Sequence, residues 1–165
     1  MINQFFKNHA PGSRVWIFQS NRELTEKEAQ QAALQVQSFV ARWTSHSEKV
    51  VADGAVFYNR FIVLVADESF VSVGGCSLDS SSGFIRELEQ TFGITLFDRL
   101  TTAYRENGVI KTAGQHAFQQ LIENGDVNSG TIVFNNLVST LKDFNEKWEI
   151  PFAESWHMRF FKMPV

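Results

Sequence analysis

The chain has 165 residues, with 15 basic and 18 acidic side chains and a net charge of −3. It has no run of basic residues, which argues against a nucleic-acid partner, because such binding depends on clustered Lys and Arg. The single cysteine, Cys76, excludes an intramolecular disulfide and suits a reducing compartment. The longest apolar run, 61–66, is far shorter than the ~20 residues of a membrane-spanning helix. With no apolar leader after Met1, we expect one soluble, cytoplasmic domain over residues 1–165 and no membrane association.

Strand and helix patterns alternate in the first half of the chain. Residues 14–20 are rich in β-branched and aromatic side chains, which predicts a strand. Residues 25–44 carry apolar side chains at helical spacing, and Thr25 and Glu28 have the spacing of a capping box. Residues 56–66 predict a strand whose second half is apolar on both faces, as in the centre of a sheet.

The later elements alternate in the same way. In chain order we expect a helix over 81–92, a hairpin with strands 100–105 and 109–111, a short helix between 112 and 125, a strand over 131–134 and a helix over 139–148. The dipeptide Asn107-Gly108 is the preferred turn for such a hairpin, and Pro151 prevents continuation of the last helix. Hairpins within this order favour a single α+β domain: a mixed β-sheet with about four helices packed mainly on one face.

Searches for common enzyme motifs find none. No Gly-Lys dipeptide occurs, so there is no phosphate-binding P-loop, and no G-x-G-x-x-G follows a strand. H-E-x-x-H and G-x-S-x-G are also absent. The four histidines are far apart in sequence, so spacing alone predicts no zinc site. We expect no cofactor and no bound metal.

One segment, residues 67–82, concentrates reactive and polar side chains between the predicted central strand and the next helix. Cys76 lies just before that helix, where backbone amides and the helix dipole stabilise an anion or a thiolate. Asp67 and Asp79 are candidate polar partners of this thiol. If residues 70–75 form a strand that pairs back, Asp67 and Cys76 lie at opposite ends; if they form a loop, the candidates converge. We favour the loop.

Other residues extend this candidate site. His157 lies beside an aromatic and a basic residue, and a Cys–His pair would supply the acid and base of nucleophilic catalysis. Arginine fits carboxylate or phosphate with paired hydrogen bonds, and asparagine amides and helix N-terminal hydroxyls also bind polar ligands. The candidate ligand-binding residues are Arg60, Ser77, Ser80, Arg99, Asn135 and Asn136.

Each candidate also has an ordinary structural interpretation. Cysteine is among the most buried residue types, so Cys76 would be an inert core thiol. Asp79 and the serines at 80–82 are good helix N-caps, and Asp67 suits a solvated turn. His157 would be a surface histidine in a C-terminal tail. These interpretations stay open from the sequence alone.

Short distinctive strings are spread over nearly the whole chain. They are Phe5-Phe6 with Pro11, Ser13-Arg14-Val15-Trp16-Ile17, Asn59-Arg60-Phe61-Ile62, Asp67-Glu68-Ser69, Gly75-Cys76-Ser77-Leu78-Asp79, Phe97-Asp98-Arg99-Leu100, Phe134-Asn135-Asn136-Leu137-Val138 and Ser155-Trp156-His157. As a set they resemble a family of short uncharacterised bacterial proteins. Some members carry the label "ABC transporter ATPase". This sequence does not support that label, because it lacks the phosphate-binding loop that holds a nucleotide. The resemblance implies no activity, but it marks Cys76 and Asp79 as family features and favours the loop over 70–73.

Two functional hypotheses follow. The first is a domain that binds a small molecule or anion, or a thiol-dependent enzyme, with its site at 67–82. The alternative is a non-catalytic protein interaction module or homodimer that uses the Phe-rich surface and the C-terminal tail 160–164, because exposed apolar patches mark interfaces. A weaker third hypothesis is a Mg²⁺ or Ca²⁺ site of Asp67, Glu68 and Asp79, whose spacing matches no known binding loop.

Overall fold

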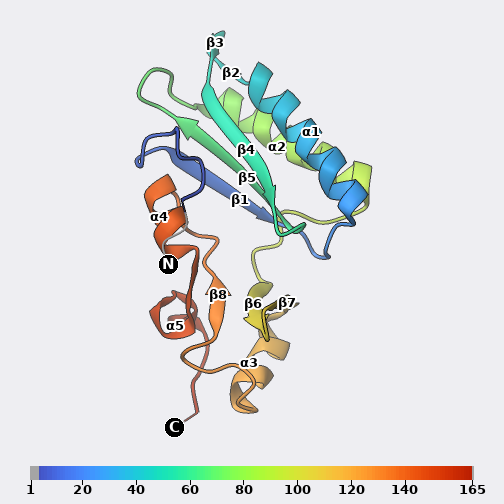
Figure 1. Ribbon diagram of the computed structural model, residues 1–165, viewed down its shortest axis with the longest axis vertical. Helices are drawn as coiled ribbons and strands as arrows, with labels where there is room; N and C mark the ends of the chain where they lie inside the picture. Colours follow the sequence, from blue (N-terminus) through green and yellow to red (C-terminus); the bar gives the residue numbers. More distant parts are fainter. Residues whose placement is uncertain (1–3, 165) are drawn as a thin grey trace.

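A three-stranded antiparallel sheet in the order β1-β5-β4 forms the centre of the larger, upper lobe (Figure 1). The computed structural model describes residues 4–164. Strand β5 (Phe61–Asp67) lies between its two neighbours, and every residue from Phe61 to Ala66 is at most 1% exposed. The prediction of a central strand here is confirmed.

The helices and strands follow one another without a long structureless segment. In chain order they are β1 (Arg14–Gln19), α1 (Glu26–Arg42), β2 (Thr44–Ser45), β3 (Glu48–Lys49), β4 (Val51–Phe57), β5, α2 (Gly75–Phe92), β6 (Thr102–Glu106), β7 (Val109–Ala113), α3 (Gln115–Glu123), β8 (Ile132–Phe134), α4 (Leu141–Lys147), β9 (Glu149–Pro151), the 3₁₀ turn η1 (Phe152–Glu154) and α5 (His157–Phe160).

Helices α1 and α2 cover one face of the β1-β5-β4 sheet (Figure 1). The rings of Phe39 and Phe84 stack between the two helices at 4.5 Å. The indole N–H of Trp43 donates to the Ser77 carbonyl at 2.9 Å, which satisfies a buried polar group. The capping box of Thr25 and Glu28 is present at the start of α1, as the sequence predicts.

The opposite face of the same sheet packs on a second apolar cluster. Phe61, Val63 and Val65 point into this cluster, which also contains Phe144 of α4 and Trp148. Two members, Ala103 and Phe134, come from the lower sheet. The two lobes therefore share one apolar cluster and are not joined by linkers alone.

The lower lobe is built on a four-stranded sheet in the order β7-β6-β8-β9 (Figure 1). Its pairings are all antiparallel. Phe118 of α3 packs against Phe152 and Phe161 and closes a third apolar cluster. The turn of the β6–β7 hairpin has positive φ at Asn107 and Gly108, as predicted from that dipeptide.

The α+β class is confirmed, but the expected single mixed sheet is not observed. The described strands form three separate sheets with antiparallel pairing throughout, and only α1 and α2 share a sheet face. Part of the physical reason is that β2–β3, β4–β5 and β6–β7 are each joined by a tight hairpin, which enforces antiparallel pairing. After α2, the segment 93–101 then carries the chain out of the first sheet.

Two predicted elements have different boundaries. The single strand expected over 56–66 is a β4–β5 hairpin, whose turn places Tyr58 and Asn59 at positive φ without a glycine. Helix α2 begins at Gly75 rather than at residue 81. Ser80 and Ser81 are therefore not caps; their hydroxyls donate back to the carbonyls of Cys76 and Leu78 within the helix.

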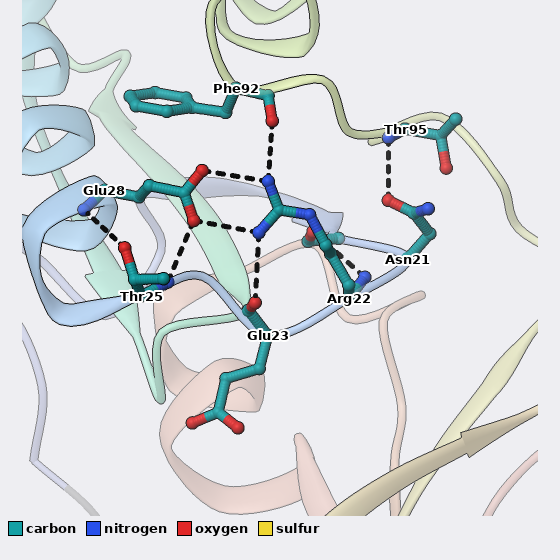
Figure 2. Close-up of polar contacts among 8 residues, drawn as sticks. Asn21, Arg22, Glu23, Thr25, Glu28, Phe92 and Thr95 are labelled. Atoms are coloured by element: carbon teal, nitrogen blue, oxygen red, sulfur yellow. Dashed lines mark hydrogen bonds and ion pairs between the residues drawn. The ribbon is translucent and has the colours of Figure 1, made fainter.

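A polar cluster ties the start of α1 to the end of α2 (Figure 2). The Arg22 guanidinium donates to both oxygens of Glu28, at 2.8 and 2.9 Å, and to the Phe92 carbonyl at 2.6 Å. Paired hydrogen bonds of this kind are charge-assisted and directional. The Phe92 carbonyl belongs to the last turn of α2, so Arg22 also satisfies a helix-end acceptor.

We predict that Arg22→Ala lowers the Tm at pH 7. We also predict that the variant loses less stability than the unmodified protein when the pH is lowered. The hydrogen bonds from Arg22, with further help from Thr25, lower the pKa of Glu28 from 4.5 to about 2. A carboxyl with a lowered pKa stabilises the fold above its unfolded value, and this stabilisation is lost as the pH falls from about 4.5 through about 2. Thermal unfolding across this interval measures it.

Arg42→Ala is the matched control, because its exposed guanidinium hydrogen-bonds only a side chain of its own helix, Ser38. This variant is expected to keep the acid profile of the unmodified protein. Identical acid profiles for both variants would contradict the assigned role of Arg22.

Candidate functional site

The segment 68–74, which follows Asp67 at the end of β5, is a loop, so the loop alternative is the one observed. The acidic side chains of Asp67 and Glu68 accept hydrogen bonds from nearby backbone N–H groups, and one of them also forms an ion pair. The Asp67 carboxylate accepts the Ser69 N–H at 2.9 Å, and the Ser69 hydrogen bonds lower the pKa of Asp67. The Glu68 carboxylate accepts the Val73 N–H at 2.9 Å and pairs with Arg14 at 3.3 Å. These acids order the loop and the adjacent start of β1.

Cys76 is the second residue of α2 and is exposed, so the expectation of a buried core thiol is wrong. The structure does not bring it together with His157. Figure 1 shows α2 in the upper lobe and α5, which begins with His157, in the lower lobe. The histidine near the start of α2 is instead His46, whose Nε2 lies 3.8 Å from the position of a Cβ at Gly74. Sequence spacing gave no signal for that proximity.

Of the remaining candidates of the upper lobe, Ser77 and Arg60 have hydrogen-bond partners within the chain. The Ser77 hydroxyl is buried and donates to the Gly74 carbonyl at 2.9 Å. Arg60 follows the β4–β5 turn, where burial lowers its pKa. Asp79 is exposed on α2. Among residues 4–164, no three His, Cys, Asp or Glu side chains are close enough to hold a metal, so Asp67, Glu68 and Asp79 do not form the hypothesised cation site.

Three of the predicted residues meet elsewhere, at a cavity of about 220 Å³ between the lobes: Arg99, Asn136 and His157 all line it. One wall is β1, and a second is the segment 96–102 that joins α2 to β6. The segment 134–139 and the pair Trp156 and His157 complete the lining. This volume is below the roughly 300–1,000 Å³ of drug-sized ligand sites, so the cavity encloses a small group or one end of a longer ligand.

A chain of side-chain amides holds two of these walls together. The Gln19 amide donates to the Thr101 carbonyl at 3.1 Å and accepts from Asn136 at 2.8 Å. The Asn136 oxygen in turn accepts the indole N–H of Trp148 at 2.9 Å. Asn136 is therefore a positioning residue that fixes the cavity wall. Asn135 instead accepts the Leu137 N–H in a local turn.

The indole nitrogen of Trp156 is buried and has no hydrogen-bond partner among the described residues. A buried donor without an acceptor costs about 1–3 kcal/mol, so native structures rarely leave one unmatched. The Trp156 ring stacks on His157 with centroids 4.0 Å apart. The sequence string Ser155-Trp156-His157 drew attention to the histidine and missed this donor.

His157 is a buried, neutral histidine rather than a surface one. Its Nδ1 lies 2.6 Å from the Ser155 hydroxyl, and burial lowers the pKa of His157 to about 4. It therefore adds polarity but no positive charge to the cavity near neutral pH.

The charged side chains at the cavity leave one cation without a partner. Arg14 is paired with Glu68 and lies over the Trp16 ring at 4.6 Å. The Asp98 carboxylate accepts the Leu100 N–H and the Thr101 hydroxyl, which lowers the pKa of Asp98. Within residues 4–164, Arg99 has no hydrogen bond or ion pair to a side chain or carbonyl. The cavity lining thus includes the exposed, unpaired Arg99 and Trp156, whose buried indole N–H is unmatched.

The C-terminal segment is used within the chain itself. Phe161 packs on Phe118, and the Lys162 backbone exchanges two hydrogen bonds with the Gln119 side chain, at 2.8 and 3.0 Å. Of this segment's aromatic residues, Phe160 remains exposed. The interaction-module and homodimer hypothesis stays a prediction.

Comparison with protein-family models, curated proteins and solved structures finds no match. The family resemblance noted from the sequence therefore stays a prediction. Within the described residues, no helix combines the length and apolar character needed to cross a bilayer.

We predict that Asn136→Ala lowers the free energy of unfolding by about 1–3 kcal/mol. The reason is that the buried Trp148 N–H and the Gln19 side-chain oxygen both lose their hydrogen-bond partner. Urea unfolding measures the change. Asn135→Ala is the control: it removes only a local turn contact and is expected to cost less. Equal losses for both variants would contradict the positioning role.

We also predict that His157→Gln reduces the pH dependence of stability below neutrality. The unfolded state takes up a proton near the ordinary pKa of 6.5, whereas the folded state does so only near 4. Stability is therefore complete above pH 6.5 and falls as the pH is lowered toward 4, by about 2 kcal/mol at pH 4.5. His116→Gln, on the exposed side of α3, is expected to retain this loss. An unchanged pH dependence in His157→Gln would overturn the assignment.

Proposed function

We propose that the protein binds a small anionic ligand in the cavity between its lobes. The observation that carries the proposal is the buried, unpartnered indole N–H of Trp156 in the wall of a cavity that also holds the unpaired Arg99. This proposal keeps the ligand class expected from the sequence and moves the site from segment 67–82 to the lobe boundary.

The residues at the cavity supply complementary parts of an anion site. The Arg99 guanidinium offers paired donors that match a carboxylate or a phosphate. The Trp156 N–H offers a neutral donor, and a ligand oxygen there would recover the cost of its burial. Asp98 does not compete for Arg99, since both of its oxygens accept hydrogen bonds within its own loop.

The rigidity of the walls also supports a binding role. Gln19 is 6% exposed, and its amide links β1 to both neighbouring segments. Such a preformed site loses little conformational entropy when a ligand enters, which favours affinity from few contacts. The exposed Cys76 has no part in this cavity, so the proposed binding does not depend on a thiol.

The test is a titration of ¹⁵N-labelled protein with isovalerate, benzoate and inorganic phosphate, observed at the indole N–H resonances. We expect a saturable shift of the Trp156 resonance, which Trp156→Phe identifies by its loss. Arg99→Gln is expected to weaken binding about tenfold, the effect of losing one charge-assisted pair. Arg159→Gln, an exposed arginine outside the cavity lining, is the matched control.

Two results would contradict the proposal. One is the absence of a saturable Trp156 shift with all three anions. The other is equal weakening by Arg99→Gln and Arg159→Gln, which would reduce the effect to the overall charge of the protein.

A further inference from the structure

We infer that the ligand of this cavity is a short extended peptide that ends in a free carboxylate and pairs with the outer edge of β1. The inference rests on the proposed function and names its ligand class. Strand addition of this kind draws affinity from main-chain hydrogen bonds and specificity from the flanking side chains.

The register of β1 shows which of its backbone groups face outward. The Ser20 N–H donates to Arg60 across the β1–β5 ladder, whereas the Val15 N–H donates away from it, to Ser139. Backbone groups alternate in direction along an antiparallel strand. The backbone N–H and C=O groups of even-numbered residues of β1 therefore face β5. Those of odd-numbered residues, including Ile17 and Gln19, face the cavity side.

The outer edge of β1 is paired along only part of its length. The chain near Thr140 bridges Arg14, and the Leu141 N–H donates to the Ser13 carbonyl at 2.8 Å. Beyond the Ser139 contact no backbone hydrogen bond joins the two segments among residues 4–164, and both line the cavity. The Ile17 N–H and C=O and the Gln19 N–H have no partner within residues 4–164.

The other edge of the same sheet is covered by side chains at one position, whereas the outward backbone groups of Ala52 and Val56 have no hydrogen-bond partner among residues 4–164. At Gly54 of β4, the outward N–H donates to the Asp53 carboxylate at 2.7 Å, and the carbonyl accepts from the Gln37 amide at 2.7 Å. Proteins commonly block exposed edges in such ways, since a bare edge is a template for another strand. The β4 edge is protected at Gly54, and the stretch of β1 from Ile17 to Gln19 has no equivalent protection of its N–H groups among the described residues.

The surroundings of the bare edge fit one extended chain better than a second sheet. Segments 96–102 and 134–139 stand on its two sides as cavity walls. Phe97, 37% exposed, packs on Phe18 on the helix-covered side, and Leu137 is 58% exposed. A peptide strand alternates its side chains between two faces, so an apolar residue on the helix-covered face would meet Phe97.

Charge complementarity predicts where the carboxylate end of the peptide lies and therefore in which direction the peptide runs. The Gln19 amide contacts the Thr101 carbonyl, so the loop that carries Arg99 lies at the Gln19 end of β1. A terminal carboxylate held by Arg99 would place the peptide parallel to β1. Among the described residues of the lining, Asp98 is the one acidic side chain, and both of its oxygens accept hydrogen bonds within its own loop.

The test compares N-acetyl-Val-Leu-Val bearing a free carboxylate with three matched probes, by calorimetry and the Trp156 indole shift. The first probe is its C-terminal amide, the second carries an N-methyl group on the leucine nitrogen, and the third is isovalerate. We expect the free peptide to bind at least about tenfold more tightly than each probe, because each lacks a charged end, a backbone donor or the backbone itself. Arg99→Gln is expected to remove the advantage of the free acid over the amide.

The outcomes separate this inference from the proposed function. Saturable isovalerate binding with no advantage for the peptide would overturn the inference and leave anion binding standing. Equal affinity for the N-methylated and unmodified peptides would overturn strand pairing, and equal affinity for the amide would overturn the carboxylate assignment. Binding of neither peptide nor anions would overturn both proposals.

Discussion

The burial of β5 on both faces is the constraint on which the rest of the structure depends. Ile62, Leu64 and Ala66 point into the cluster beneath α1 and α2, and the intervening residues point into the cluster shared with the lower lobe. Burying a large aliphatic side chain contributes ~1.5–3 kcal/mol. A one-residue slip would exchange the two faces and lose the fit of both clusters, so the register of the neighbouring strands is fixed.

That fixed register determines where the cavity forms. With β5 central, β1 and β4 become edges, and the outward backbone groups of each edge follow from the ladder. Side chains close the β4 edge at Gly54, whereas the chain near Thr140 closes only the first part of β1. The hydrogen bonds of Gln19 with Thr101 and Asn136 then fix the position of these segments relative to β1. The candidate site is therefore a consequence of incomplete edge pairing.

The sequence predicts those features whose cause is local. The capping box of Thr25, the turn at Asn107-Gly108 and the apolar run 61–66 each combine a short pattern with a strong backbone or burial preference. The turn at Tyr58 and Asn59 was missed because its residues carry no glycine signal for positive φ. Helix α2 was predicted too short because its serines resemble caps, although they bond back within the helix.

The candidate site depends on contacts that no local pattern encodes. His157 is buried, and its expected partner Cys76 lies in the other lobe. The Trp156 donor and the Ile17 backbone become informative only because the fold leaves them without partners. An unsatisfied group is a property of tertiary structure, so a single sequence gives no signal for it.

Amide hydrogen exchange along β1 tests the account most directly. The N–H groups of Trp16 and Phe18 face β5, and we predict that they are protected in the free protein, while those of Ile17 and Gln19 exchange rapidly. Saturation with the free-acid peptide should then slow exchange at Ile17 and Gln19 and leave Gly54 of β4 unchanged. Equal protection along all of β1 in the free protein, or no gain on peptide binding, would contradict the account.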